Sequence, residues 1–454
     1  MLELSQILAI AIFVVMFIAI AIGRIHRYIP ALAGAALVII VVFIGVMRSP
    51  ESVLSVLNLG RLGQLRFWVL GQEPVEPHGV NWQTIIFIGG MMVMVEGMAE
   101  AGFFRWLCLY VAKMVHYQAV LILITFMLLS GFLAMFIDSI TVLLFLSMVT
   151  IELARLLKFD PVPVIVAEIF AANTGGSATM CGNPPNIIIG TAFGYTFTDF
   201  AINTGPIAWI GMMVTLAYFW FIFRKTLPLP QQADSDSPLN QYPEPSEAIT
   251  SPMLFGMNTS IFILLVILLV THAQTGLSMA SIGVIAAFLA LATATKGALH
   301  IVQRIDWRTL LFLVGLFICV GGLEETGVLK MIAEYVGRVS GGNILLVIPV
   351  ILWLSAFASA IVDNIPFAAM MVPVVSQISL SSGVSLSALS WTLTLGGNIG
   401  GNATPIGASA NVVGTAIAEK EGYHIGWGRF LRYAFLPMII VVALCWLYLV
   451  IRYA

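Results

Sequence analysis

The chain has 454 residues, of which 60% are hydrophobic and only 9% are charged, and its formal net charge is −2. A soluble globular domain carries about 25% charged residues, so this chain cannot cover its surface with groups that water solvates. The composition predicts a polytopic protein of the lipid bilayer, and no basic run points to a nucleic-acid partner.

Apolar runs long enough to cross a bilayer, roughly 17–25 residues, recur along the whole chain. The predicted spans of the first half are 5–22, 29–47, 82–99, 163–192 and 205–223, and those of the second half are 256–272, 280–295, 307–323, 388–417 and 432–450. Two more apolar stretches, 118–157 and 344–377, are interrupted by Asp138 and Asp363. We predict that both are re-entrant hairpins, with two ordinary spans each as the alternative.

A long segment of the sequence occurs twice, 225 positions apart and without a gap. The repeated pairs include Trp82 with Trp307, Asp138 with Asp363, Asn173 with Asn398, and Asn186 with Asn411. Secondary transporters are often built from two related halves around a shared site. Because five spans per half is an odd number, we predict an inverted repeat: 1–225, a polar linker at 226–255, and 256–454.

The distribution of positive charge predicts the orientation of this arrangement. Most of the 20 lysines and arginines lie on the side that holds the linker 226–255. The positive-inside rule makes that side cytoplasmic, so both termini are expected outside. The first hairpin then opens to the cytoplasm and the second to the outside.

Polar segments at 173–186 and 398–411 interrupt two of the predicted spans at membrane depth. Their glycines and prolines cannot sustain a helix, so 163–192 and 388–417 are predicted to be broken helices. Non-helical backbone survives at this depth only when it is buried in protein or lines a cavity. The ends of the half-helices would offer amides and carbonyls to a solute or a cation.

Ionisable and nucleophilic side chains at membrane depth are the candidates for chemistry. Asp138 and Asp363 predict a functional site, because an unpaired carboxylate there is costly; the alternative is a structural cap of a hairpin tip. Glu168 is a candidate proton carrier, and the alternative is a carboxyl bonded to a neighbouring helix. Cys181 is a candidate thiolate ligand for As(III), and the alternative is a small apolar filler.

Four strings carry a family resemblance: FIDSITVLL, ANTGGSATMCGNPPNIIIG, VDNIPFAAMMVP and GGNATPIGASANVVGTAIAEKEGY. They resemble the ArsB/NhaD-like branch of the ion transporter superfamily, which includes arsenite efflux permeases, sodium/proton antiporters and the P protein and is related to citrate and dicarboxylate carriers. The resemblance extends from about residue 10 to residue 450. It implies a prokaryotic plasma (inner) membrane protein with a dimerising scaffold, elevator-type movement of a transport domain, and association with an arsenical ATPase subunit.

The resemblance also implies a substrate and ion site at the hairpin tips and the broken-helix loops. Carried onto this sequence, the site comprises Asp138, Ser139, Thr141, Asn173, Thr174, Asn183, Asn186, Asp363, Asn364, Asn398, Thr404, Ser409 and Asn411. The family's usual GDPPN reads Gly182-Asn-Pro-Pro-Asn186 here. An amide therefore replaces a carboxylate, which weakens the case for tight binding of a hard cation in the first half.

Three transport functions follow from these expectations. The first is proton-coupled efflux of arsenite or antimonite, with Asp138, Asp363 or Glu168 carrying the proton. The second is sodium/proton antiport, in which the same acids bind the cation. The third is uptake of a citrate-like carboxylate, which the lack of Lys and Arg in the polar breaks disfavours. No enzyme activity, cofactor or structural metal is expected; the coupling ion is H⁺ or Na⁺.

Overall fold

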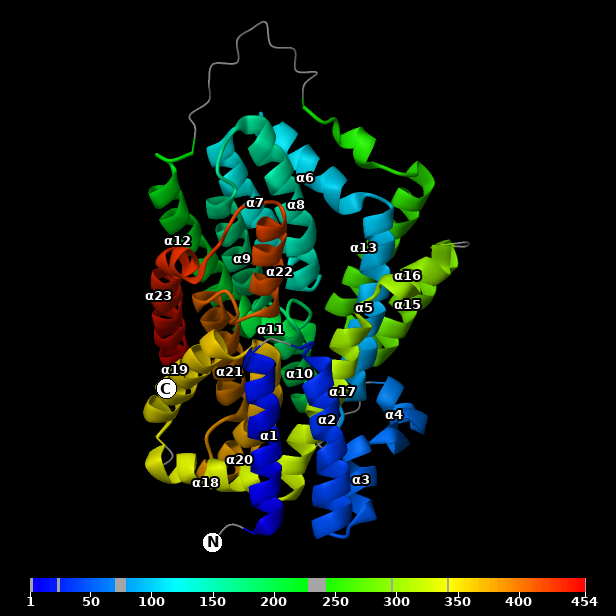
Figure 1. The fold of residues 1–454 in the computed structure, drawn as a ribbon, viewed down its shortest axis with the longest axis vertical. Helices are drawn as coiled ribbons and strands as arrows, with labels where there is room; N and C mark the ends of the chain where they lie inside the picture. Colours follow the sequence, from blue (N-terminus) through cyan, green and yellow to red (C-terminus); the bar gives the residue numbers. More distant parts are fainter. Residues whose placement is uncertain are drawn as a thin grey trace, which may run out of the picture.

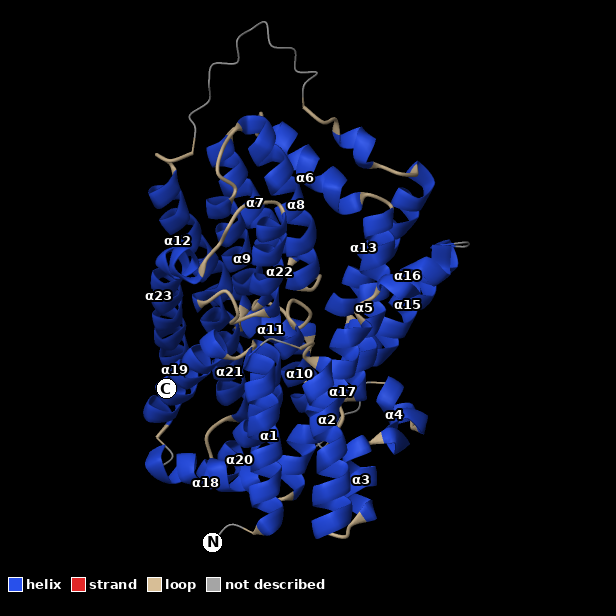
Figure 2. Ribbon diagram, viewed as in Figure 1, coloured by secondary structure: helices blue, strands red, loops and turns tan. Residues whose placement is uncertain are grey.

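The computed structural model describes residues 3–22, 25–69, 79–227, 242–294, 297–340 and 343–453. Within these ranges the fold is helical and contains no strand, apart from one antiparallel bridge between Val69 and Leu277 (Figures 1 and 2). This confirms the all-α fold class that the composition predicts.

The helices of the first half include short ones between the longer ones. They are α1 (Leu4–Ile22), α2 (Tyr28–Leu37), η1 (Val38–Val46), α3 (Pro50–Leu57), η2 (Leu59–Gly63), α4 (Leu65–Trp68), α5 (Trp82–Glu100), α6 (Phe103–Met114), α7 (Ala119–Leu133), α8 (Ser139–Leu157), α9 (Val162–Gly176), α10 (Pro184–Phe193), α11 (Phe197–Asn203) and α12 (Gly205–Phe223).

The second half has a similar order of helices. They are η4 (Pro245–Ala248), α13 (Pro252–Val270), α14 (His272–Thr275), α15 (Met279–Ala294), α16 (Ala298–Arg304), α17 (Trp307–Glu325), α18 (Val328–Ser340), α19 (Ile344–Ile361), α20 (Asn364–Ser382), α21 (Leu386–Gly400), η6 (Gly401–Ala403), α22 (Ser409–Lys420) and α23 (Trp427–Tyr453).

Nine helices in the described ranges are long and apolar enough to cross a bilayer. They are the continuous helix of α2 and η1, together with α5, α8, α12, α13, α17, α19, α20 and α23. Large apolar side chains on their outer faces, such as Ile40, Ile263 and Leu447, are more than half exposed, as lipid contact requires. The chain is therefore a multi-pass membrane protein.

The two halves have equivalent helix boundaries. α5 begins at Trp82 and α17 at Trp307, and α10 begins at Pro184 and α22 at Ser409, each pair 225 positions apart. Both predicted hairpins are pairs of helices, α7 with α8 and α19 with α20, and Asp138 and Asp363 cap the second helix of each pair. Because α8, α19 and α20 are also long enough to span, the re-entrant hairpins and the inverted orientation of the halves stay predictions.

Glycines let pairs of helices pack with their backbones almost in contact. A Cβ atom added at Gly90 of α5 would lie 2.0 Å from the Gly283 carbonyl of α15, and one at Gly175 of α9 would lie 2.2 Å from the Gly131 carbonyl of α7. Close backbone approach at small residues is how helices associate in membranes, where no hydrophobic force draws them together. These contacts join α5 to α15 and α7 to α9.

Each hairpin is also bonded to the broken helix that it packs against. The Thr179 hydroxyl donates to the carbonyl of Met135, and the Thr404 hydroxyl donates to the carbonyl of Ala360 at 2.5 Å. The two threonines are repeat partners and so are their acceptors. Figure 1 shows α7, α8 and α9 in the upper part of the molecule and α18 and α20 in the lower part. These bonds fix each hairpin tip beside a helix break.

Candidate functional site

Both predicted broken helices are interrupted, and their breaks meet in a cluster of buried asparagines. α9 ends at Gly176 and α10 begins at Pro184; α21 ends at Gly400 and α22 begins at Ser409. The cluster consists of Asn173, Asn183, Asn186, Asn398, Asn402 and Asn411, each no more than 1% exposed. Both halves of the chain contribute to it.

Hydrogen bonds between side chains join the two breaks directly. Asn173 Nδ2 donates to Asn402 Oδ1 at 2.9 Å and to Asn411 Oδ1 at 2.7 Å. Asn398 of the second half bonds to two asparagines of the first break. Its Nδ2 donates to Asn186 Oδ1 at 2.6 Å, and its Oδ1 accepts from Asn183 Nδ2 at 3.1 Å. A buried network with this many satisfied members favours one arrangement of the two breaks.

Two of the asparagines also satisfy carbonyls that the helix breaks release. Asn186 Nδ2 donates to the carbonyls of Gly176, at 2.9 Å, and Thr179, at 2.7 Å. Its repeat partner Asn411 donates to the carbonyls of Gly401 and Thr404, both at 2.7 Å. An NH₂ group with two donors replaces the missing helical amides, so an amide is needed here where a carboxylate could not donate.

The two hairpin tips differ in how their carboxylates are bonded. Asp363 Oδ1 accepts from the amide of Ile365 at 3.1 Å, and Asp363 Oδ2 accepts from Ser409 Oγ at 2.5 Å and forms an ion pair with Arg27. Asp138 Oδ1 is buried and has no hydrogen-bond partner among the described residues. One reason is that Pro184 occupies the repeat position of Ser409 and cannot donate.

A cavity of about 10 Å³ lies where both tips and both breaks converge. Its lining residues are Asp138, Ser139, Ile140, Asn173, Asn183, Pro184, Asn364, Ile365, Ala408, Ser409 and Ala410. Space of this size holds about one water molecule or one bare cation. Asn173 Oδ1, like Asp138 Oδ1, is buried without a partner in the described structure. Two unpartnered acceptors on one small cavity favour a ligand that is a cation or a hydrogen-bond donor.

The structure brings most of the predicted site residues to this region. Asp138, Ser139, Asn173, Asn183, Asn364 and Ser409 line the cavity, and Asn186, Asn398, Asn411, Thr174 and Thr404 belong to the hydrogen-bonded shell around it, with Asp363 bonded to Ser409. Thr141, Glu168 and Cys181 are not part of the described lining.

Glu168 and Cys181 are both buried away from the cavity. Glu168 Oε1 accepts a hydrogen bond from Thr150 of α8, while Glu168 Oε2 has no partner among the described residues. The bond to Thr150 fits the interpretation of a carboxyl held by a neighbouring helix. Cys181 is 3% exposed and packs in the hydrophobic core, which fits the interpretation of an apolar filler.

Sequence reasoning missed two residues of this site. Asn402 accepts from Asn173, but its repeat partner is Ser177, so the repeat gives no signal for it. Arg27 comes from the turn before α2, yet its guanidinium reaches the Asp363 carboxylate and donates to Ser409 Oγ at 2.8 Å. The absence of Lys and Arg from the polar breaks thus did not mean that the site lacks a cation.

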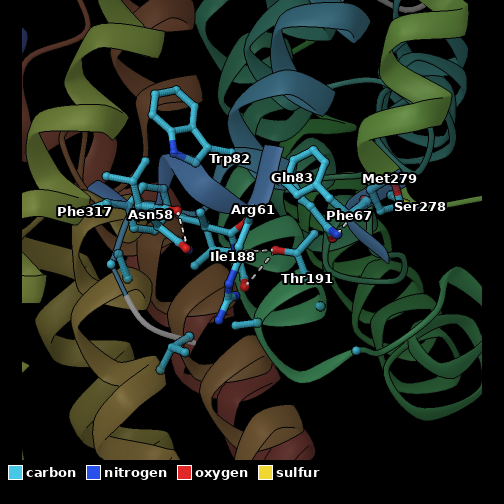
Figure 3. A pocket seen from close by; sticks show the side chains of 18 of the residues that line it. Asn58, Arg61, Phe67, Trp82, Gln83, Ile188, Thr191, Ser278, Met279 and Phe317 are labelled. Atoms are coloured by element: carbon cyan, nitrogen blue, oxygen red, sulfur yellow. Dashed lines mark hydrogen bonds between the residues drawn. The ribbon is translucent and has the colours of Figure 1, made fainter. Parts of the chain in front are cut away.

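A second and larger pocket, of about 660 Å³, lies between α10 and α20 on one side and α5, α15 and α17 on the other. Figure 3 shows Arg61, Trp82, Gln83, Thr191 and Phe317 around it. It shares no lining residue with the small cavity. His272 also lines it.

Hydrogen bonds join the N-terminal end of α5 to Thr191 of α10, which lines this pocket. Asn81 Nδ2 donates to Thr191 Oγ1 at 2.8 Å, and the hydroxyls of Thr84 and Thr191 are also 2.8 Å apart (Figure 3 shows Thr191). Any movement of α10 along α5 must break both contacts.

Asn183→Asp introduces the carboxylate of the GDPPN motif that the sequence resembles, and it is expected to raise the affinity of the cavity for a cation. The change replaces the Nδ2 that donates to Asn398 Oδ1 with an oxygen that faces another acceptor. Asn398 cannot rotate to help, because its Nδ2 already donates to Asn186 and to the carbonyl of Thr394. A cation or proton must then neutralise the added charge, so the half-maximal cation concentration should fall by about tenfold or more.

Titration of the purified protein with Na⁺ and with protons measures this effect, with Asn186→Asp as the control. Asn186 Nδ2 donates to two backbone carbonyls, so its loss should reduce folded protein instead of shifting the ion dependence. An Asn183→Asp variant with an unchanged ion dependence would contradict the expected role of Asn183 at the cavity.

Comparison with known proteins gives one family and several relatives. A profile described as "Citrate transporter" (CitMHS) matches residues 14–396. The "46 kDa membrane protein" of Mycobacterium leprae is 31% identical over 99% of both chains. The P protein of Sus scrofa is 28% identical over 92% of this chain and 59% of its own length. The YdaH transporter of Alcanivorax borkumensis, a solved structure, has a TM-score of 0.56 at 13% identity and covers 80% of this chain and 84% of its own; that likeness concerns the fold alone.

Proposed function

This chain belongs to the CitMHS citrate transporter family and is a membrane transporter rather than an enzyme, and from that premise we propose that it exchanges a small oxygen-rich solute for protons. The first candidate solute is arsenite or antimonite, exported from the cell. The proposed centre is the cavity between the hairpin tips, with Asp138 as the group that carries the coupling proton.

The unpartnered oxygens of Asp138 and Asn173 carry this proposal. Arsenite and antimonite are neutral trihydroxides at neutral pH, so they present O–H donors to these acceptors. A citrate-like anion presents acceptors almost everywhere, and acceptors facing acceptors repel unless a cation lies between them. The donor character of the trihydroxide therefore matches the cavity better. Because about 10 Å³ is too small for the whole solute, binding requires the two tips to separate.

Coupling follows from the position of Asp138 at the tip. An ionised Asp138 with one oxygen unpartnered is costly at this depth, so the empty site favours uptake of a proton or a cation before the hairpin can move through the membrane. Glu168, with one unpartnered oxygen in the same half, is the second proposed proton carrier. We propose that α7–α12 and α19–α23 move together against α1–α5 and α13–α17.

Sodium/proton exchange is the second candidate, and the size of the cavity favours it. A single dehydrated cation fits about 10 Å³, and the carboxylate and amide oxygens around it are hard ligands. Import of a citrate-like carboxylate is the third candidate, which the family description and the guanidinium of Arg27 favour.

One panel of proteoliposome assays separates these candidates. Purified protein is reconstituted and tested for arsenite, sodium and citrate movement under an imposed pH gradient, with empty liposomes and Asp138→Asn as controls. The proposal expects arsenite flux that depends on the pH gradient and disappears in Asp138→Asn. Sodium flux against protons with arsenite unmoved would replace the proposal with the second candidate, and citrate accumulation would replace it with the third.

A further inference from the structure

The Arg27 side chain reaches the candidate site from the turn between α1 and α2, and no other described residue of α1 or α2 lines the cavity. Arg27 immediately precedes α2, at the turn that follows α1. Its Nη1 atom forms an ion pair with Asp363 Oδ2 and donates to Ser409 Oγ at 2.8 Å, and Ser409 Oγ itself donates to Asp363 Oδ2 at 2.5 Å. One nitrogen, one carboxylate oxygen and one hydroxyl oxygen thus form a closed triangle.

Two of the three groups in this triangle, the Asp363 carboxylate and the Ser409 hydroxyl, are groups that a monovalent cation would use as ligands. A carboxylate and a hydroxyl are oxygen ligands, and Asp363 and Ser409 come from the second hairpin tip and the second break. The Asp363 side chain is only 7% exposed, whereas the Arg27 side chain is 37% exposed and so keeps partial access to solvent. Arg27 therefore occupies the position of a cation without being enclosed in the site.

Among the described residues, no guanidinium forms an ion pair with Asp138 at the first hairpin tip, the equivalent repeat position. Asp138 Oδ1 is unpartnered in the described residues, and Pro184 stands where Ser409 stands in the second half. The two tips therefore differ in charge balance although they are repeat partners. The Asp363 carboxylate has a cationic partner within the protein, and one oxygen of the Asp138 carboxylate has no partner among the described residues.

We propose that Arg27 is a tethered cation that competes with the coupling ion for Asp363 and holds the empty carrier in one position. This inference rests on the proposed ion-coupled transport by a moving hairpin, and it adds Asp363 to Asp138 as a carboxylate that binds the coupling ion. While the pair is formed, the second hairpin is bonded to the α1–α2 turn. A coupling ion that takes over the Asp363 carboxylate releases Arg27 and frees the hairpin to move.

The consequence for transport is that a carrier without its ion cannot cross. Moving the hairpin with Asp363 ionised and Arg27 left behind would separate two opposite charges at low dielectric, which is strongly unfavourable. The ion pair thus suppresses slippage, the return of an empty carrier without ion exchange.

The test is a graded series at Arg27 in proteoliposomes. Arg27→Gln should lower the half-maximal concentration of the driving ion, H⁺ or Na⁺, by about tenfold, because an opposite charge in contact changes the ion affinity of a carboxylate by roughly one to three orders of magnitude. It should also raise solute leak without an ion gradient. Arg27→Lys keeps the charge but loses the planar donor set, so its shift should be intermediate, about threefold. Arg304→Gln, which removes an exposed partner of Glu96, is the charge-matched control and should leave both quantities unchanged.

Each outcome supports or overturns the proposal. If both Arg27 variants keep the original ion dependence, the tethered cation is wrong. If the KM for solute rises while the ion dependence is unchanged, Arg27 is an anion ligand and the proposal is also wrong. If Arg27→Gln does not accumulate as folded protein, the shift in Arg27→Lys decides.

A separate variant keeps failure of this inference distinct from failure of the proposed function. Asp363→Asn, with Arg27 unchanged, should abolish the ion dependence of transport if Asp363 binds the ion. Ion-dependent transport that persists in Asp363→Asn would overturn the proposed role of Asp363 itself. If Asp363→Asn loses ion-dependent transport while the Arg27 variants keep the original ion dependence, only the competition between Arg27 and the coupling ion is overturned.

Discussion

Asp138→Asn is expected to abolish ion-driven transport while the protein folds normally. Asp138 Oδ1 has no partner among the described residues, and the amide oxygen of an asparagine can still accept from the backbone amides of Ile140 and Thr141, so the substitution should cost little stability. The substitution removes the charge that attracts the coupling ion, and driven flux should fall by about 100-fold or more, as when a proton-transfer group is deleted. Flux in proteoliposomes and the thermal midpoint in detergent are the two measurements.

Asp363→Asn is the matched comparison at the second hairpin tip. It removes the partner of Arg27 and weakens the bond from Ser409, so it should reduce stability as well as flux. The destabilisation should be about 1–3 kcal/mol, below the full value for a buried pair because Arg27 is partly exposed. An Asp138→Asn variant that still transports against a gradient would remove the first tip from the coupling scheme.

Gly400→Ala is expected to have the largest effect on folding, and the nearby Gly397→Ala the smallest. A Cβ at Gly400 would lie 2.3 Å from both the Cα and the carbonyl oxygen of Ala356 in α19, so one backbone must move. Overpacking against backbone should cost about 3 kcal/mol or more. A Cβ at Gly397 meets nothing within 4 Å, so alanine there should add about 1 kcal/mol through helix propensity.

The two variants form a close control pair, because both glycines are buried in α21 and lie three residues apart. Heating detergent-solubilised protein and measuring the folded fraction by size-exclusion chromatography gives their thermal midpoints. Gly400→Ala should unfold well below the parent protein and Gly397→Ala at or above it. Equal thermal midpoints would show that α19 and α21 can move apart without loss of stability, contrary to the close approach of Gly400 to Ala356.

The parts of the site that sequence could predict are those fixed by local backbone chemistry and by the repeat. Gly175 and Gly176 weaken a helix and are the last residues of α9, and Pro184 is the first residue of α10, so the first break is local information, and the 225-residue offset transfers it to the second. The hairpin tips follow in the same way, because a carboxylate in an apolar run marks a helix start. Asp138 and Asp363 accordingly cap α8 and α20.

The contacts that sequence could not predict join residues hundreds of positions apart. The Arg27–Asp363 pair spans 336 positions, and nothing in the periodicity of α1 or α2 indicates where a flexible guanidinium will reach. Asn402 was missed because the second break uses an asparagine where the first has Ser177. The bonds from Asn81 and Thr84 to Thr191 likewise depend on how two halves pack, which composition and spacing do not encode.

The 660 Å³ pocket between α10 and α17 has a pharmacological consequence. It has the volume of a drug-binding cavity, and its walls belong to elements that we propose slide past one another. A compound lodged beside Phe317 and Thr191 would block that sliding without competing with the solute (Figure 3). Inhibitors of this kind would lower the maximal rate and leave the apparent affinity for cargo untouched.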